Sequence, residues 1–171
     1  IQTARGHKVL VANVMTRLFM DALDDPFAAA DKLCKSHRLG GDVHAIFIDV
    51  HGEATSEKMA LAHYCDGRAS LVVGTHTHIP TADAQILPGG TGYQTDAGMC
   101  GNYNSVVGMD ISIAVNRFVR KVPGDRLRAA EGPATLCGTY AEIDSKTGLC
   151  VRIEPVRLGG RLSHSLPEVA T

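Results

Sequence analysis

The chain has 171 residues, a net charge of −1 and 44% hydrophobic residues, which is enough for one core and predicts a single domain over residues 1–171. No Lys/Arg block is present, so a dedicated nucleic-acid-binding surface is not expected. The apolar runs are strand-sized and fall short of the ~20 residues of a membrane helix. Five scattered cysteines without a C-x-x-C pair favour reduced thiols and a cytoplasmic protein.

The first half of the chain alternates strands and helices. Residues 7–15 read as a strand, and 24–41 as a helix that Asp25 can cap. "HAIFIDV" (44–50) is a nearly continuous apolar run with β-branched residues, which predicts a strand covered on both faces. Residues 55–67 are expected to form a second helix, capped by Ser or Thr. This order predicts an α/β fold.

The second half contains further strands and one helix. Residues 69–74 form another buried-strand pattern, and a short hairpin is expected around the turn Pro88-Gly89-Gly90. Residues 109–121 predict a helix with one apolar face. A C-terminal hairpin joined by "SKTG" follows, and residues 163–171 are expected to be a loose tail.

Three histidines follow two neighbouring strands. The strand, helix and strand over residues 44–74 predict a βαβ unit with two parallel strands. His51 follows the first strand, and His76 and His78 follow the second. Because parallel strands end at the same edge of a sheet, the three side chains are expected to converge there.

Two interpretations of "HTH" at 76–78 differ in function. Neutral histidine is the commonest metal ligand, and residues at i and i+2 can donate two nitrogens to one ion. A single H-x-H also occurs by chance as a solvated loop pair. His51 at the matching strand end favours the metal site.

Several carboxylates lie near these histidines in the sequence. Glu57 has a structural interpretation as a favourable charge in the first turn of a helix. Glu53 could instead orient a ligand histidine. Asp83 and Asp96 flank the histidine loop and the loop "TDAGMCGNYNS", whose amides either approach a phosphate or form an ordinary turn.

The motifs resemble those of a known family. "H-x-E-A-T-S-E-K", "D-G-R-x-S-x-V-V-G-T-H-T-H", "T-A-D-x-x-I-L-P-x-G-T" and "T-D-x-G-M" are similar to the YmdB-like metallophosphoesterases over residues 20–110, with compatible elements to 157. The resemblance implies that His51, His76 and His78 are metal ligands. It leaves candidates for a supporting or substrate-loop role: Glu53, Thr75, Thr77, Asp83 and Asp96.

The resemblance implies a bacterial dinuclear-metal phosphodiesterase that hydrolyses 2′,3′-cyclic nucleotides or related small phosphodiesters. Two divalent ions, iron or manganese, would activate a bridging hydroxide that attacks phosphorus. The implied fold is a calcineurin-like metallophosphoesterase α-β-β-α sandwich.

This sequence departs from the family pattern in three ways. Gly52 replaces the usual Ala, which we expect to be harmless, and Cys100 and Asn102 replace Thr and Pro. The family's N-terminal ligands and its general-acid histidine have no counterpart, so the chain resembles only the C-terminal portion of such an enzyme. No catalytic residue is assigned, and little or no turnover and weak metal binding are expected of the chain alone.

Other interpretations remain open at this point. The chain could be a non-catalytic nucleotide- or metal-binding module that keeps the fold. An H-x-H metal-dependent amidohydrolase fits less well, because only His164 lies further downstream. A homo-oligomer is plausible because exposed sheet and helix surfaces need cover.

Overall fold

The centre of the molecule is a five-stranded, mostly parallel sheet. The computed structural model describes residues 1–122 and 124–168, with strand order β1-β2-β3-β5-β4. Four strands run parallel to one another and β4 runs antiparallel to β5. The bounds are β1 Val9–Met15, β2 Ala45–His51, β3 Leu71–Thr75, β4 Gln85–Ile86 and β5 Gly92–Gln94. The predicted α/β class and the short hairpin before β5 are confirmed.

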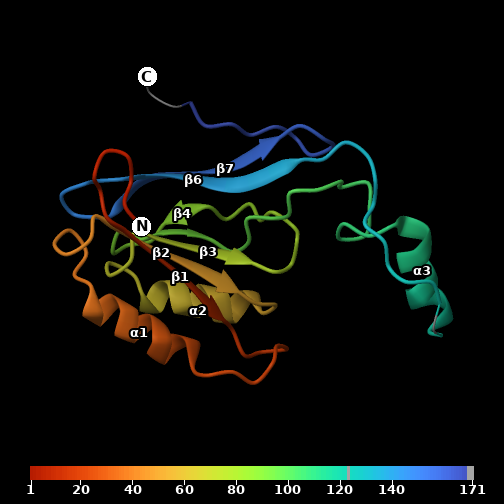
Figure 1. Cartoon of the computed structure of the whole chain (residues 1–171), viewed down its shortest axis with the longest axis horizontal. Coiled ribbons are helices and arrows are strands. Elements are labelled where there is room, and N and C mark those ends of the chain that lie inside the picture. Colours follow the sequence, from red (N-terminus) through yellow and green to blue (C-terminus); the bar gives the residue numbers. More distant parts are fainter. Residues whose placement is uncertain (123, 169–171) are drawn as a thin grey trace.

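Helices cover one face of this sheet (Figure 1). α1 (Pro26–Ser36) and α2 (Thr55–Tyr64) lie together beneath it, whereas α3 (Ile111–Arg120) stands at one end of the molecule. The strands and helix β2-α2-β3 form the predicted βαβ unit, with β2 and β3 parallel. None of the helices in the described part of the chain could span a bilayer, since each has only 10 or 11 residues.

A two-stranded hairpin lies over the opposite face. β6 (Leu136–Ile143) pairs antiparallel with β7 (Cys150–Leu158), as predicted, and β7 runs beside β4 and β5. Beyond β7, Ser165 forms an isolated bridge with Arg157. The end of the predicted tail, residues 169–171, lies outside the described residues.

The N-terminal cap of α1 is the predicted one, whereas the cap of α2 differs from the prediction. Asp25 caps α1 by accepting from the amides of Phe27 and Ala28 at 2.9 and 3.4 Å. α2 begins after Ala54, which makes no side-chain cap hydrogen bond. The predicted Ser or Thr cap is therefore wrong, because the cap position falls on a residue without a polar side chain.

β2 is fully covered on one face and partly covered on the other. Ile46, Ile48 and Val50 are fully buried in the core shared with the helices. Phe47 and His51, which point the other way, are only half-buried, so the prediction of a strand covered on both faces is wrong. The reason is that the β6–β7 hairpin lies over β4 and β5 at the far side of the sheet.

α3 has the predicted amphipathic pattern, but most of its apolar side chains stay at the surface. Phe118 is 75% exposed and Val119 is 74% exposed, while Ile113 and Ala114 are buried. Asp110 caps the helix by accepting from the Ile113 amide at 3.1 Å.

Gly74 in β3 occupies a position where a side chain has no room. A Cβ added there would overlap the carbonyl oxygen of Thr95 and lie 2.8 Å from Cδ of Lys58. Glycine is therefore required for β3 and β5 to approach each other and for the Lys58 side chain to pass between them and α2.

We predict that Gly74→Ala destabilises the protein by about 1–3 kcal/mol, because the backbone at Thr95, directly after β5, cannot move aside. Gly138→Ala is the matched control, since Gly138 is also a strand residue and has nothing within 4 Å of the added Cβ. Urea unfolding measures both free energies. Equal effects of the two substitutions would contradict the packing argument.

Candidate metal centre

The candidate site is built where four parallel strands end. His51, the last residue of β2, is in register with Thr75, the last residue of β3, and Met15 of β1 is in register with His51. Gln94 of β5 pairs with Val73, so the chain after β5 leaves the sheet at the same edge. The βαβ unit therefore brings His51 and His76 together, as the sequence predicts.

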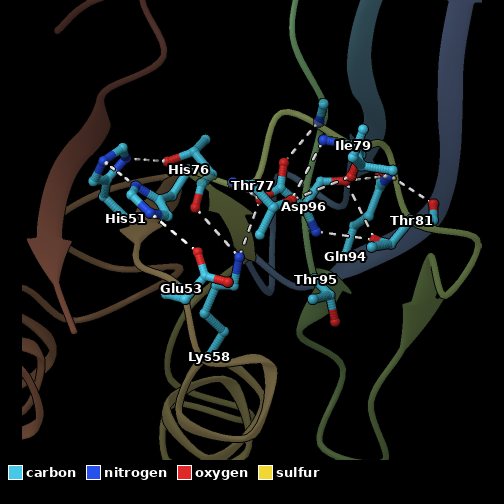
Figure 2. Close-up of polar contacts among 12 residues, drawn as sticks. His51, Glu53, Lys58, His76, Thr77, Ile79, Thr81, Gln94, Thr95 and Asp96 are labelled. Carbon is cyan, nitrogen blue, oxygen red and sulfur yellow. Dashed lines mark hydrogen bonds and ion pairs between the residues drawn. The ribbon is translucent and has the colours of Figure 1, made fainter. Parts of the chain in front are cut away.

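His51 and His76 are in direct contact. Nδ1 of His76 lies 3.2 Å from Nε2 of His51, and the two rings are nearly perpendicular at 88°. Two nitrogens bound to one ion at ~2.0–2.1 Å lie about 2.8–3.4 Å apart, from adjacent octahedral to tetrahedral positions. The pair therefore has the spacing of two ligands of one metal ion (Figure 2).

A chain of hydrogen bonds orients the His51 ring. The Thr75 hydroxyl donates to Oδ1 of Asp49 at 2.8 Å, and Nδ1 of His51 lies 2.9 Å from the same hydroxyl. Asn13 donates to the other oxygen of Asp49 at 2.8 Å. Because the hydroxyl proton is used on Asp49, Nδ1 of His51 is the donor to Thr75. Nε2 of His51 then keeps its lone pair, which is the atom directed at His76.

Glu53 lies on the other side of the His76 ring. Its Oε2 is 3.2 Å from Nε2 of His76, and both side chains are partly exposed. A carboxylate on the outer nitrogen is the usual partner of a metal-binding histidine. The two rings thus have their outer nitrogens on Thr75 and Glu53, and their inner nitrogens facing each other.

His78 does not join this pair. Its Nδ1 lies 2.8 Å from the carbonyl oxygen of Val107, which leaves Nε2 without a partner among the described contacts. Across residues 1–122 and 124–168, no three His, Cys, Asp or Glu side chains are arranged to hold a metal ion. The predicted convergence is therefore confirmed for His51 and His76 but not for His78, whose Nδ1 is held at the Val107 carbonyl.

The backbone of the histidine loop is unusual. His76 and His78 have φ values of 110° and 69°, a region that non-glycine residues seldom adopt. Such conformations cost about 1–3 kcal/mol each and persist only when surrounding contacts hold them. Between them, the Thr77 amide donates to Oδ2 of Asp96 at 3.0 Å.

Of the two aspartates singled out in the sequence, neither contacts the histidine rings. Asp83 accepts hydrogen bonds from the amide and hydroxyl of Thr95, and so ties the loop after His78 to the end of β5. Burial raises the pKa of Asp83, but hydrogen bonds from Thr81 and Thr95 outweigh it and lower the pKa below its usual value. Asp96 is buried beneath the loop.

Two residues of α2 that sequence reasoning did not assign to the site brace its loops. Glu57 accepts from the amides of Arg17 at 3.0 Å and Leu18 at 2.8 Å, so it holds the loop after β1 rather than only favouring the helix start. Lys58 donates to Asp96 at 3.1 Å. Charged residues in a helix normally face solvent, so the sequence carried no direct signal for this role; only Gly74, whose missing side chain leaves space for Lys58, hinted at it.

Gly52 is not interchangeable with alanine in this chain. A Cβ there would overlap the side chain of Thr16, which is fully buried and whose hydroxyl oxygen has no hydrogen-bond partner. The backbone after His51 packs directly on Thr16, so glycine is the residue that fits at this position. That glycine in place of the family's alanine is harmless stays a prediction.

Comparison with known proteins identifies relatives. A family model described as YmdB-like protein matches residues 1–156. The chain is 48% identical to the 2′,3′-cyclic-nucleotide 2′-phosphodiesterase of Bacillus subtilis over 90% of its own length and 57% of that protein's.

Two crystal structures are similar. A hypothetical protein from Thermus thermophilus superposes with a TM-score of 0.85 at 45% identity, covering 94% of this chain and 61% of that one. A phosphatase from Mycoplasma pneumoniae has a TM-score of 0.78 at 30% identity, covering 87% and 52%. The chain therefore spans little more than half the length of these relatives.

We predict that Asp83→Asn destabilises the protein near neutral pH by about 1 kcal/mol, because a charged acceptor for Thr95 is lost. The folded-state pKa of Asp83 is lowered, so its contribution is present above its unfolded value of 3.8 and is lost as pH falls through the folded value. Urea unfolding at about pH 7 and about pH 3 should show the difference from wild type shrinking with acid. Exposed Asp21→Asn is the control. A difference that grows with acid would contradict this assignment.

Proposed function

The chain belongs to the YmdB-like family, and we propose that its protein is a metal-dependent phosphodiesterase acting on 2′,3′-cyclic nucleotides or related small phosphodiesters. The observation that carries the proposal is the contact between His51 and His76 at 3.2 Å, with their outer nitrogens on Thr75 and Glu53. The name of the Bacillus subtilis relative supports the substrate class.

The proposed cofactor is a pair of divalent ions, iron or manganese. His51 and His76 would supply Nε2 and Nδ1 to one ion, and His78 would use Nε2, since its Nδ1 is held by Val107. When bound, such ions supply positive charge that activates water and neutralises phosphate oxygens.

The chain's own residues would hold and orient this centre. Thr75 fixes the tautomer of His51, so its lone pair is available without rearrangement. Glu53 receives the outer N–H of His76 and keeps the ring turned toward His51. Thr77 is partly buried and lies between the two histidines of the loop, where its side chain would contact substrate.

We further propose that the remaining ligands, and a second layer of an α-β-β-α sandwich, come from outside these 171 residues. The relatives are longer than the matched region, and the described residues bring only two ligands together. The half-open face of the sheet supports this, because Val11 is 50% exposed and pairs with half-buried Phe47.

A non-catalytic binding module is the alternative, and the incomplete ligand set favours it. Turnover distinguishes the two. A binding module would bind metal or nucleotide at the same place. It would not hydrolyse the phosphodiester, either as the 171-residue chain or as a longer form of the protein.

We predict that the 171-residue chain binds Mn²⁺ more weakly than the Bacillus subtilis relative, and hydrolyses bis(p-nitrophenyl) phosphate and 2′,3′-cyclic AMP at least ~100-fold more slowly, because ligands that hold the metal and stabilise transition-state charge are missing. The relative, assayed in parallel with Mn²⁺ or Fe²⁺, is the positive control.

In the same assays, His51→Ala and His76→Ala should abolish Mn²⁺ binding, whereas exposed His63→Ala should not. Full binding after loss of either histidine would overturn the ligand assignment. Turnover by the chain comparable with that of the relative would overturn the proposed incompleteness.

We predict that Thr75→Val weakens Mn²⁺ binding about 10–100-fold, because Nδ1 of His51 loses the acceptor that fixes its tautomer. Thr139→Val is the control, since the Thr139 hydroxyl also donates a hydrogen bond, to Gln94, but lies on the hairpin. Isothermal titration measures both. An unchanged dissociation constant for Thr75→Val would remove Thr75 from the site.

A further inference from the structure

A buried ion pair lies directly under the histidine loop. The side chain of Lys58 is 0% exposed and that of Asp96 is 1% exposed, and their charged atoms are 3.1 Å apart. Lys58 projects from the first turn of α2, and Asp96 follows β5 (Figure 2). The pair therefore joins two elements that are 38 positions apart in the sequence.

The contacts of this pair converge on the loop backbone. Nζ of Lys58 also donates to the carbonyl oxygen of Thr75 at 3.3 Å, immediately before His76. Oδ2 of Asp96 accepts from the Thr77 amide at 3.0 Å, immediately after His76. The ion pair is thus hydrogen-bonded to the peptide groups on both sides of His76.

Asp96 also forms hydrogen bonds with residues after the histidine loop, at Thr81, and after β5, at Gly98. Its Oδ1 accepts from the Gly98 amide at 2.9 Å, and its backbone carbonyl accepts from the Thr81 amide at 3.0 Å. Both segments flank His78, because the Met99 amide donates to the His78 carbonyl at 3.0 Å. One aspartate therefore links the positions of both loop histidines.

We propose that Lys58 and Asp96 are positioning residues that hold His76 and His78 in the backbone conformation needed to bind metal. The inference rests on the proposed function, in that the loop histidines are ligands. The two positive φ values, 110° and 69°, require an external restraint, and the pair supplies it at the residue between them.

Stability alone is a poor explanation for this pair. Replacing a buried ion pair with apolar side chains of similar size is often neutral or stabilising, because desolvation opposes the attraction between the charges. The structure nevertheless makes room for the lysine, since Gly74 leaves the space that its Cδ occupies. An apolar pair could fill the same space but could not form the hydrogen bonds that Lys58 and Asp96 make with the loop backbone.

The test uses three variants of the 171-residue chain: Lys58→Met, Asp96→Asn, and the double variant Lys58→Met/Asp96→Leu, which replaces the pair with apolar groups and guards against unfolding caused by one unpaired charge. The control is Arg68→Met/Asp31→Asn, which removes the 2.8 Å ion pair between Arg68 and Asp31 on the helical side of the sheet.

The first measurement is amide hydrogen exchange of the metal-free proteins. We expect the Thr77 amide to exchange at least ~10-fold faster in the double variant, which removes its Asp96 acceptor, while amides of β2 and β3 keep wild-type rates. The control should leave Thr77 unchanged. Wild-type protection of Thr77 in the folded double variant would overturn the proposal, whether or not the protein binds metal.

The second measurement is Mn²⁺ affinity by isothermal titration. We expect each folded variant to bind about 10–100-fold more weakly than wild type, and the double variant to be no weaker than the single ones, because both remove the same restraint. Faster exchange with unchanged Mn²⁺ affinity would overturn the positioning role. Absence of Mn²⁺ binding by wild type would instead contradict the proposed function, and amide exchange would then decide the loop restraint alone.

Discussion

The parallel pairing of β2 with β3 is the constraint on which the site depends. With His51 opposite Thr75, the residue after β3 is placed against the last residue of β2, and this brings two imidazoles within 3.2 Å. A shift of one residue would turn His51 into the core and bring Val50 out. The fully buried face formed by Ile46, Ile48 and Val50 therefore fixes the register that the histidines need.

The first turn of α2 converts this arrangement of strands into a defined site. Glu57 holds the backbone after β1, and Lys58, through Asp96, holds the backbone after β3. Charged side chains are seldom fully buried unless they are paired. Here both face inward and satisfy loop amides or carbonyls, so the loops that carry the histidines are tied to the helix beneath the sheet.

The sequence predicted the βαβ unit, the hairpins and the convergence of His51 with His76, because these follow from hydrophobic periodicity and strand direction. It did not predict the roles of Lys58 and Asp96, since a lysine in an amphipathic helix normally faces solvent and only the glycine at position 74 hinted at close packing. The orientation of His78 toward Val107 depends on a loop whose path has no periodic signal. The burial of the second face of β2 was overestimated, because an apolar run in the sequence does not show which strands the β6–β7 hairpin will cover.

The central claim is that His51 and His76 bind the same divalent ion. Anomalous diffraction from crystals grown with Mn²⁺ tests it directly. We expect a peak within about 2.0–2.3 Å of Nε2 of His51 and Nδ1 of His76, with the outer nitrogens still on Thr75 and Glu53. A peak elsewhere, or none at this edge of the sheet at saturating Mn²⁺, would contradict the account.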